Sequence, residues 1–205
     1  MTRASRGWKW ARHSKPDDKQ RRQVVRVACV GTGDLCGLVG SECPGTRMFV
    51  DTVRPTNQGV LRYLGRAEKS RNALITAPSS VPQPYLSQGS HPDIVQRVWD
   101  DLGAILPGEC RCLVYGTPAI VHDQTGVVIA ICNGTQYNLR LTADRFHEAL
   151  AKGASTRTRW SGGEEMDCLA VLGAGWIFGG WYKEEVQWCR DTYEENRTAS
   201  QVAGD

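Results

Sequence analysis

An apolar run followed at once by a tight-turn signal constrains this chain more than any other feature. The run covers residues 127–132 (VVIAIC), and Asn133 and Gly134 come directly after it. Asn-Gly is the pair that two-residue β-hairpin loops favour, because such loops need positive φ angles. Residues 136–141 then alternate between apolar and polar side chains. The sequence therefore predicts a hairpin whose first strand is central in an antiparallel sheet.

The elements around this hairpin are expected to be a mixture of strands and helices. Three more strands are expected, over residues 112–115, 119–122 and 156–160. Three helices are expected from apolar spacing and capping residues, over residues 90–106, 143–152 and 180–196. Hairpin turns in this order predict an α+β domain, with an antiparallel sheet of about four to five strands packed against helices.

The chain is expected to divide into four zones along its length. Residues 1–22 read as a disordered basic arm, and residues 23–89 as a poorly structured segment that ends in a Pro-rich linker. Residues 90–196 form the expected α+β domain, and residues 197–205 a disordered tail. No run of eighteen apolar residues and no apolar signal-peptide core is found, so a soluble, cytoplasmic protein with reduced cysteines is expected.

The positive charge of the chain is concentrated near its start. Residues 1–47 hold ten Lys and Arg against four Asp and Glu, whereas residues 48–205 hold fifteen against eighteen. One alternative is that the native chain begins at Met48 and that residues 1–47 are upstream sequence without selected structure. A second is a functional arm that tracks phosphates and stacks bases, through Arg3, Arg6, Trp8, Lys9, Trp10, Arg12, Arg21 and Arg22. The third, which is favoured over the functional arm, is a disordered tail with no partner.

A family resemblance covers about residues 91–196. Tyr115-Gly116, the Asp123-to-Gly126 turn, the strands on either side and the aromatic-rich closing stretch WIFGGWYKEEVQWCRDTYEE follow a recurring order. This order resembles the TfoX N-terminal-like and YjbR-like domains, although Gly116-Thr117 stands where those families usually have Gly-Gly. The resemblance implies a small α+β fold, and a TfoX-like regulatory role rather than a defined chemistry.

No catalytic, cofactor or metal site can be assembled from the sequence. The segment GTGDLCG has Gly31 and Gly33 where a dinucleotide fingerprint needs them, but Cys36 occupies the third glycine position. Six residues lie between successive cysteines near it, Cys29, Cys36 and Cys43, which is too many for the paired thiolates of a zinc knuckle. Cys110, Cys112 and His122 are the candidate set for covalent catalysis, and the sequence fixes no acid-base partner for them.

Aromatic side chains near the C-terminus supply the favoured functional hypothesis. Trp and Tyr are enriched at interface hot spots, and the surface expected to meet a partner comprises Trp176, Trp181, Tyr182 and Trp188. The sequence therefore favours a non-catalytic binding or regulatory module, acting through protein–protein contacts and needing no cofactor or metal. The alternatives are a nucleic-acid-associated protein that uses the basic arm, and an enzyme of a type that cannot be assigned.

Overall fold

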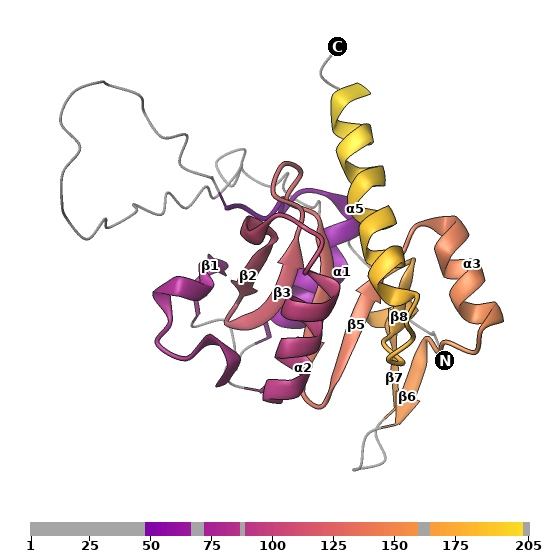
Figure 1. The fold of residues 1–205 in the computed structure, drawn as a ribbon, viewed down its shortest axis with the longest axis horizontal. Coiled ribbons are helices and arrows are strands. Elements are labelled where there is room, and N and C mark those ends of the chain that lie inside the picture. The colour runs from indigo at the N-terminus through magenta and orange to yellow at the C-terminus, as the bar shows by residue number, and fades with distance from the viewer. Residues whose placement is uncertain (1–47, 67–71, 87–88, 160–164, 203–205) are drawn as a thin grey trace, which may run out of the picture.

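The computed structural model describes residues 48–66, 72–86, 89–159 and 165–202. The basic arm and the glycine-rich GTGDLCG segment lie outside these residues. The described chain is built around one antiparallel sheet of six strands, in the order β1-β2-β3-β4-β5-β8 (Figure 1). The strands are β1 (Ile75–Thr76), β2 (Arg111–Val114), β3 (Thr117–Val121), β4 (Val128–Asn133), β5 (Gln136–Arg140) and β8 (Trp176–Phe178). This confirms the α+β class and the antiparallel sheet, with one strand more than the upper estimate.

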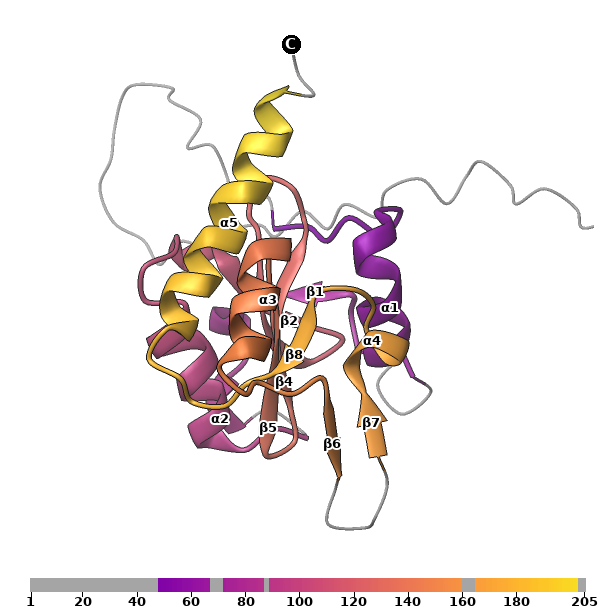
Figure 2. The same cartoon turned by 90° about the vertical axis from the view of Figure 1, so that its right-hand side faces the viewer.

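The helices cover both faces of this sheet. One face packs against α2 (Pro92–Gln96), η4 (Arg97–Leu102), α3 (Ala143–Ala151) and α5 (Glu185–Val202). The other packs against α1 (Pro55–Leu64), α4 (Cys168–Val171) and the small hairpin of β6 (Arg157–Arg159) and β7 (Glu165–Asp167). Figure 2 shows α2, α3 and α5 on one side of the sheet and α1 and α4 on the other. The sheet is buried on both sides, which is why every residue of β4 is buried.

The predicted hairpin forms, but its loop is shifted by one residue. Asn133 is the last residue of β4 and pairs with Gln136, so the two loop residues are Gly134 and Thr135. Gly134 has a φ of 65°. Thr135 is not among the non-glycine residues of positive φ, so only the first loop position needs glycine, as in a type II′ turn. The Asn-Gly signal thus located the turn while Asn133 itself stays in the strand.

Residues before position 90 belong to the same sheet and core. Ile75 of β1 pairs with Val114 of β2, and Val60 and Leu64 of α1 are fully buried against the sheet. The Asn57 side chain accepts a hydrogen bond from the Val128 N–H and donates one to the Gly126 carbonyl. The described part of residues 23–89 is therefore not a linker, and the domain expected over residues 90–196 extends towards the N-terminus.

The last helix also differs from its expected bounds. It begins at Glu185 rather than near residue 180, because Trp181 has a φ of 60°, which an α-helix does not allow. It continues to Val202, so the tail expected from residue 197 is helical over most of its length. Within the ranges that the structure describes, no helix is long and apolar enough to span a membrane.

Candidate functional site

The four aromatic residues of the expected partner surface have very different environments. Trp176 and Trp188 are buried in the two core layers on opposite faces of the sheet. Tyr182 is partly buried against the core, with its ring tilted towards Trp188. Only Trp181 is exposed, at 56%. The structure therefore reduces the aromatic surface to Trp181 with the accessible part of Tyr182.

A buried ionic network lies directly beneath Trp181. The Arg97 guanidinium donates through Nη2 to Glu185 Oε2 at 2.9 Å and through Nη1 to Asp101 at 3.1 Å. The Tyr137 hydroxyl donates to the same Glu185 oxygen at 2.5 Å. Glu185 is wholly buried. Three elements that are distant in sequence, namely η4, β5 and the start of α5, are joined by this one carboxylate.

The network also fixes the backbone of the chain just before α5. The Gly180 N–H donates to Glu185 Oε1 at 2.7 Å, and the Trp181 N–H donates to the Tyr137 hydroxyl at 2.9 Å. Arg97 Nη2 donates further to the Tyr182 carbonyl. Positive φ is uncommon for a bulky residue and persists only where the surroundings impose it. These hydrogen bonds are what hold Trp181 in that conformation.

A close approach of backbone to ring explains the glycine before this segment. A Cβ on Gly179 would lie within van der Waals overlap of the Tyr137 ring, so any side chain there would displace the ring. Tyr137 contacts Trp181 edge-to-face at 5.8 Å between ring centroids, and the Arg97 guanidinium lies 5.2 Å from the Trp181 ring centroid. The indole is thus supported on its protein side and open on the other.

The electrostatics of the network favour full charge on Arg97. Burial acts to lower the pKa of Arg97, but hydrogen bonds with Tyr137 and Glu185 outweigh it, and the net shift is upward. Burial, and then the hydrogen bond to Glu185, raise the pKa of Tyr137 above its ordinary value. The phenol therefore stays protonated and acts as a donor to Glu185 at neutral pH. The network is structural and does not supply a general base.

Sequence reasoning missed Arg97, Tyr137 and Glu185. One signal was present: Arg97 lies inside the apolar helical stripe, between Val95 and Val98, where a solvated charge is not expected. The structure adds an observation that the sequence does not contain. Arg97 begins η4, a π-helical turn of the kind often found at functional positions, in which the Gly103 N–H donates to the Val98 carbonyl. Glu185 and Tyr137 gave no comparable signal.

The cysteine and histidine set does not form a nucleophilic site. Cys110 lies in a 3₁₀ turn and packs in one core layer, while Cys112 of β2 packs in the other. Burial raises the pKa of the Cys110 thiol to about 12 and raises that of Cys112 as well. A reactive cysteine needs a lowered pKa, so both thiols are in the wrong state for attack at neutral pH.

His122 is occupied with the β3–β4 turn. Its Nδ1 accepts hydrogen bonds from the Gln124 and Thr125 N–H groups, and its ring stacks on Tyr193 of α5 at 4.3 Å. Burial lowers the pKa of His122 from its ordinary 6.5, so the ring is neutral at pH 7. The Tyr193 hydroxyl donates to Asp123, which ties α5 to this turn.

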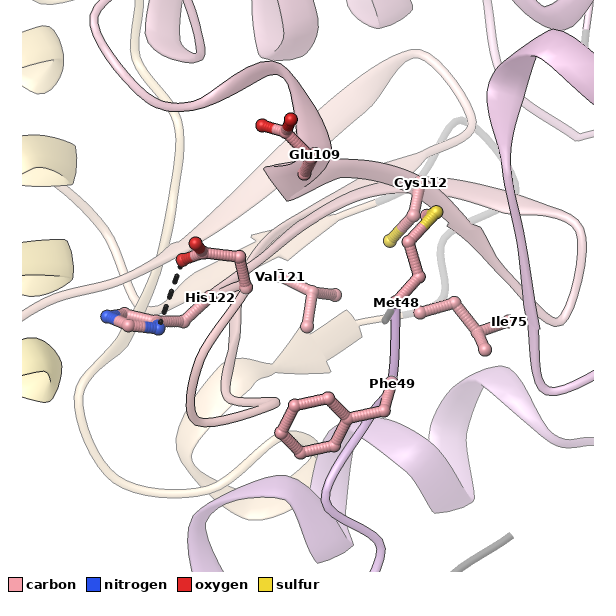
Figure 3. A pocket seen from close by; sticks show the side chains of 8 residues that line it. Met48, Phe49, Ile75, Glu109, Cys112, Val121 and His122 are labelled. Carbon is pink, nitrogen blue, oxygen red and sulfur yellow. Dashed lines mark ion pairs between the residues drawn. The ribbon is translucent and has the colours of Figure 1, made fainter. Parts of the chain in front are cut away.

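A small hollow lies beside His122 and is shown in Figure 3. Its walls are mostly apolar, with Met48, Ile75, Cys112 and Val121 gathered on one side and the His122 ring pointing to the other. Its cavity volume of about 10 Å³ is far below the roughly 300–1,000 Å³ of ordinary small-molecule sites. Across residues 48–66, 72–86, 89–159 and 165–202, no group of three His, Cys, Asp or Glu side chains could hold a metal ion.

The comparisons with known proteins add no relative. The chain matches no protein-family model, no curated protein and no solved structure. The fold and its side chains alone therefore define the class, an α+β domain with an antiparallel sheet between two helical layers.

Proposed function

We propose that this protein is a non-catalytic binding module that recognises a protein partner through Trp181. The observation that carries the proposal is the combination of a strained backbone and an exposed ring. Trp181 has a φ of 60° and remains 56% exposed, although its own N–H donates to Tyr137 and the N–H of the preceding Gly180 donates to Glu185. Backbone strain that the surrounding structure imposes in this way clusters at functional sites, which is why we assign a function to Trp181.

The surroundings of Trp181 suit an interface hot spot. A rigid indole contributes a large contact area at little entropic cost, and polar neighbours exclude water at its rim. Two accessible charged residues lie close to Trp181. Lys183 is two residues later in the chain, and Asp101 pairs with Arg97, whose guanidinium lies against the indole. Glu184, the next residue, pairs with Lys152. The raised thiol pKa values of Cys110 and Cys112 argue for binding rather than covalent catalysis.

The test is a variant that removes the indole but keeps the backbone conformation. Asn tolerates positive φ better than other non-glycine residues, so Trp181→Asn preserves the turn. We expect proteins captured by the wild-type chain from a lysate of its source to be lost with Trp181→Asn. A purified partner should then bind the variant at least about tenfold more weakly, as loss of a hot spot implies.

The control is Arg190→Gln, which changes an exposed side chain of α5 and should leave capture unchanged. Unfolding midpoints of all three proteins should agree closely, so that loss of binding is not loss of fold. Equal binding by Trp181→Asn would refute the proposal. Self-association that depends on Trp181, seen by sedimentation, would identify the partner as a second copy of the chain.

A further inference from the structure

Two buried N–H donors without acceptors lie side by side at one end of the sheet. Arg140 of β5 is directly opposite Trp176 of β8, so both side chains lie on the same face of the sheet. Arg140 Nη1 and Trp176 Nε1 are buried, and neither has a hydrogen-bond partner among the residues that the structure describes. A buried donor without an acceptor costs stability, and an unpaired guanidinium costs more. The arrangement needs an explanation that packing alone does not give.

A second cation lies near this pair. Burial, and then the charge of Arg54 just before α1, lower the pKa of Arg140. The Arg54 guanidinium has no ion pair in the described chain. Glu195 of α5 is near enough to favour the charged form of Arg140, yet the two form no ion pair. Glu195 therefore offsets the repulsion between the two guanidinium groups only in part, without a direct ion pair to Arg140 among the described residues.

The β3–β4 turn adds further donors at the same end of the sheet. Ala130 of β4 pairs with Leu139 of β5, which brings the start of β4 beside the end of β5. His122 Nδ1 accepts two backbone hydrogen bonds, so Nε2 carries the proton, and it has no acceptor in the described chain. Thr125 Oγ1 is also buried without a partner there. Among the described residues, seven buried side-chain nitrogen or oxygen atoms lack a partner, and four of them are at this end of the sheet.

We propose that Arg54, Arg140 and Trp176 form an oxyanion site that takes the phosphate group of a small phosphorylated ligand. The cluster offers donors and no acceptor, and phosphate oxygens at neutral pH are strong acceptors. The planar fork of an arginine fits two phosphate oxygens at once. Two positive charges match a phosphate dianion better than a single carboxylate. Arg140 as a whole is only partly buried, so its side chain lies at the edge of the core, although Nη1 itself is buried.

Inorganic phosphate is the probe for the first test, on the full chain. We expect phosphate to raise the unfolding midpoint in a saturable way, beyond the effect of sodium chloride at equal ionic strength. In a ¹⁵N-correlated spectrum, the indole N–H signal of Trp176, assigned by its absence in Trp176→Phe, should move as phosphate is added. Acetate should produce a weaker effect at the same concentration, whereas an equal effect of acetate would overturn the phosphate assignment.

Three variants and one control locate the site. Arg140→Gln should weaken phosphate binding about tenfold to a hundredfold, since hydrogen bonds to charged groups are strong. Trp176→Phe keeps a smaller aromatic ring and removes one neutral donor, so a loss of about fivefold is expected. Arg54→Gln should also weaken binding, and more so at low salt. Arg190→Gln removes an equal charge from an exposed position and should change nothing.

Two results would overturn the site. One is a wild-type midpoint that responds to phosphate no more than to chloride. The other is phosphate binding that persists unchanged in Arg140→Gln and in Trp176→Phe. If Arg140→Gln does not fold, Trp176→Phe and Arg54→Gln decide the question, because each alters one group of the cluster alone. None of these variants touches Trp181, so the outcome is separate from that of the proposed protein interface.

Discussion

Two buried clusters, each built around an arginine, lie on opposite faces of strand β5. The arginine of one cluster is paired with carboxylates, and within the described residues the arginine of the other is not. On one face of the sheet, Arg97 has Glu185, Asp101 and Tyr137 as partners, and its pKa is raised. On the other face, Arg140 has no ion pair in the described chain, and its pKa is lowered. The two guanidinium groups are chemically identical. Their different states come from whether the fold supplies an anion.

The difference separates structural charge from charge that is available to a ligand. Arg97 donates to Tyr137, Asp101, Tyr182 and Glu185, and so holds η4, β5 and the start of α5 together. Arg140 Nη1 and Trp176 Nε1 have no acceptor in the described chain despite burial. A folded protein rarely leaves such groups unpaired, and exceptions call for an explanation such as a bound water, ion or ligand. The paired cluster therefore supports the proposed partner surface, and the unpaired cluster is the proposed anion site.

The largest expected effect breaks the paired cluster. Glu185→Gln removes the negative charge beneath Arg97 while keeping the shape of the side chain. Breaking a buried ion pair typically costs about 3–5 kcal/mol, and the low end, about 3 kcal/mol, is expected because Asp101 remains. Urea unfolding measures this loss. Glu184→Gln, one residue earlier at the accessible pair with Lys152, is the control and should have a far smaller effect.

A smaller loss is expected when the hydroxyl of the paired cluster is removed. Tyr137→Phe deletes the donor to Glu185 and the acceptor of the Trp181 N–H. Loss of these buried hydrogen bonds should cost about 1–2 kcal/mol in the same unfolding experiment. The Trp181 ring should also become more mobile, which its fluorescence anisotropy would report. Tyr85→Phe removes an accessible hydroxyl and serves as the control, and equal losses in the two variants would contradict the assigned role of Tyr137.

The unpaired cluster should respond in the opposite direction. Arg140→Met removes a partly buried charge that lacks an ion pair in the described chain, so stability in phosphate-free buffer should be unchanged or higher by up to about 1 kcal/mol. Arg97→Met should instead lower stability, because it leaves Glu185 buried without its cation. If both substitutions cost the same in urea unfolding, the contrast between the two clusters would be wrong.

The smallest expected effect concerns His122. Burial, and to a lesser extent the positive charge of Arg54, lowers the pKa of His122, as it lowers that of Arg140. Burial, opposed by Asp123 and Glu194 and assisted by Arg54, holds the pKa of His122 below 6.5. Because the pKa of His122 is lower in the folded protein than in the unfolded chain, its contribution to stability is complete above pH 6.5. That contribution is lost as the pH falls through the pKa of the folded state. Arg54→Gln should raise the pKa of His122 in an NMR titration. Arg190→Gln should not, and an unchanged value in Arg54→Gln would remove Arg54 from this end of the sheet.

Much of the fold could be predicted because the local signals agreed with one another. The turn glycines, the apolar run of β4 and the Thr142 cap of α3, which accepts from the Arg145 N–H, all specify their own neighbourhoods. Strand β8 and helix α4 were missed because they are short. Strand β8 has three residues and helix α4 has four. Both are stabilised by contacts with distant segments, such as the hydrogen bond that the Leu141 N–H donates to the Gly175 carbonyl just before β8.

The aromatic residues show the same limit at the level of the site. Composition and spacing alone grouped Trp176, Trp181 and Trp188 into one surface. The structure buries Trp176 and Trp188 on opposite faces of the sheet and leaves Trp181 exposed. The exposure of a side chain depends on the element and the face on which it lies. Long-range contacts decide this here, because they set the register of β5 with β8 and the residue at which α5 begins.

The sequence by itself determined the fold class, the hairpin and most element positions, because these follow from interactions between residues close along the chain. Only the tertiary structure decided the state of each buried charge. Arg97 and Glu185 are 88 residues apart, and Arg140 meets Trp176 only because β5 pairs with β8. A charge is stabilised or left unpaired by the groups that surround it in space. Periodicity and turn signals carry no information about those groups when they come from distant parts of the chain.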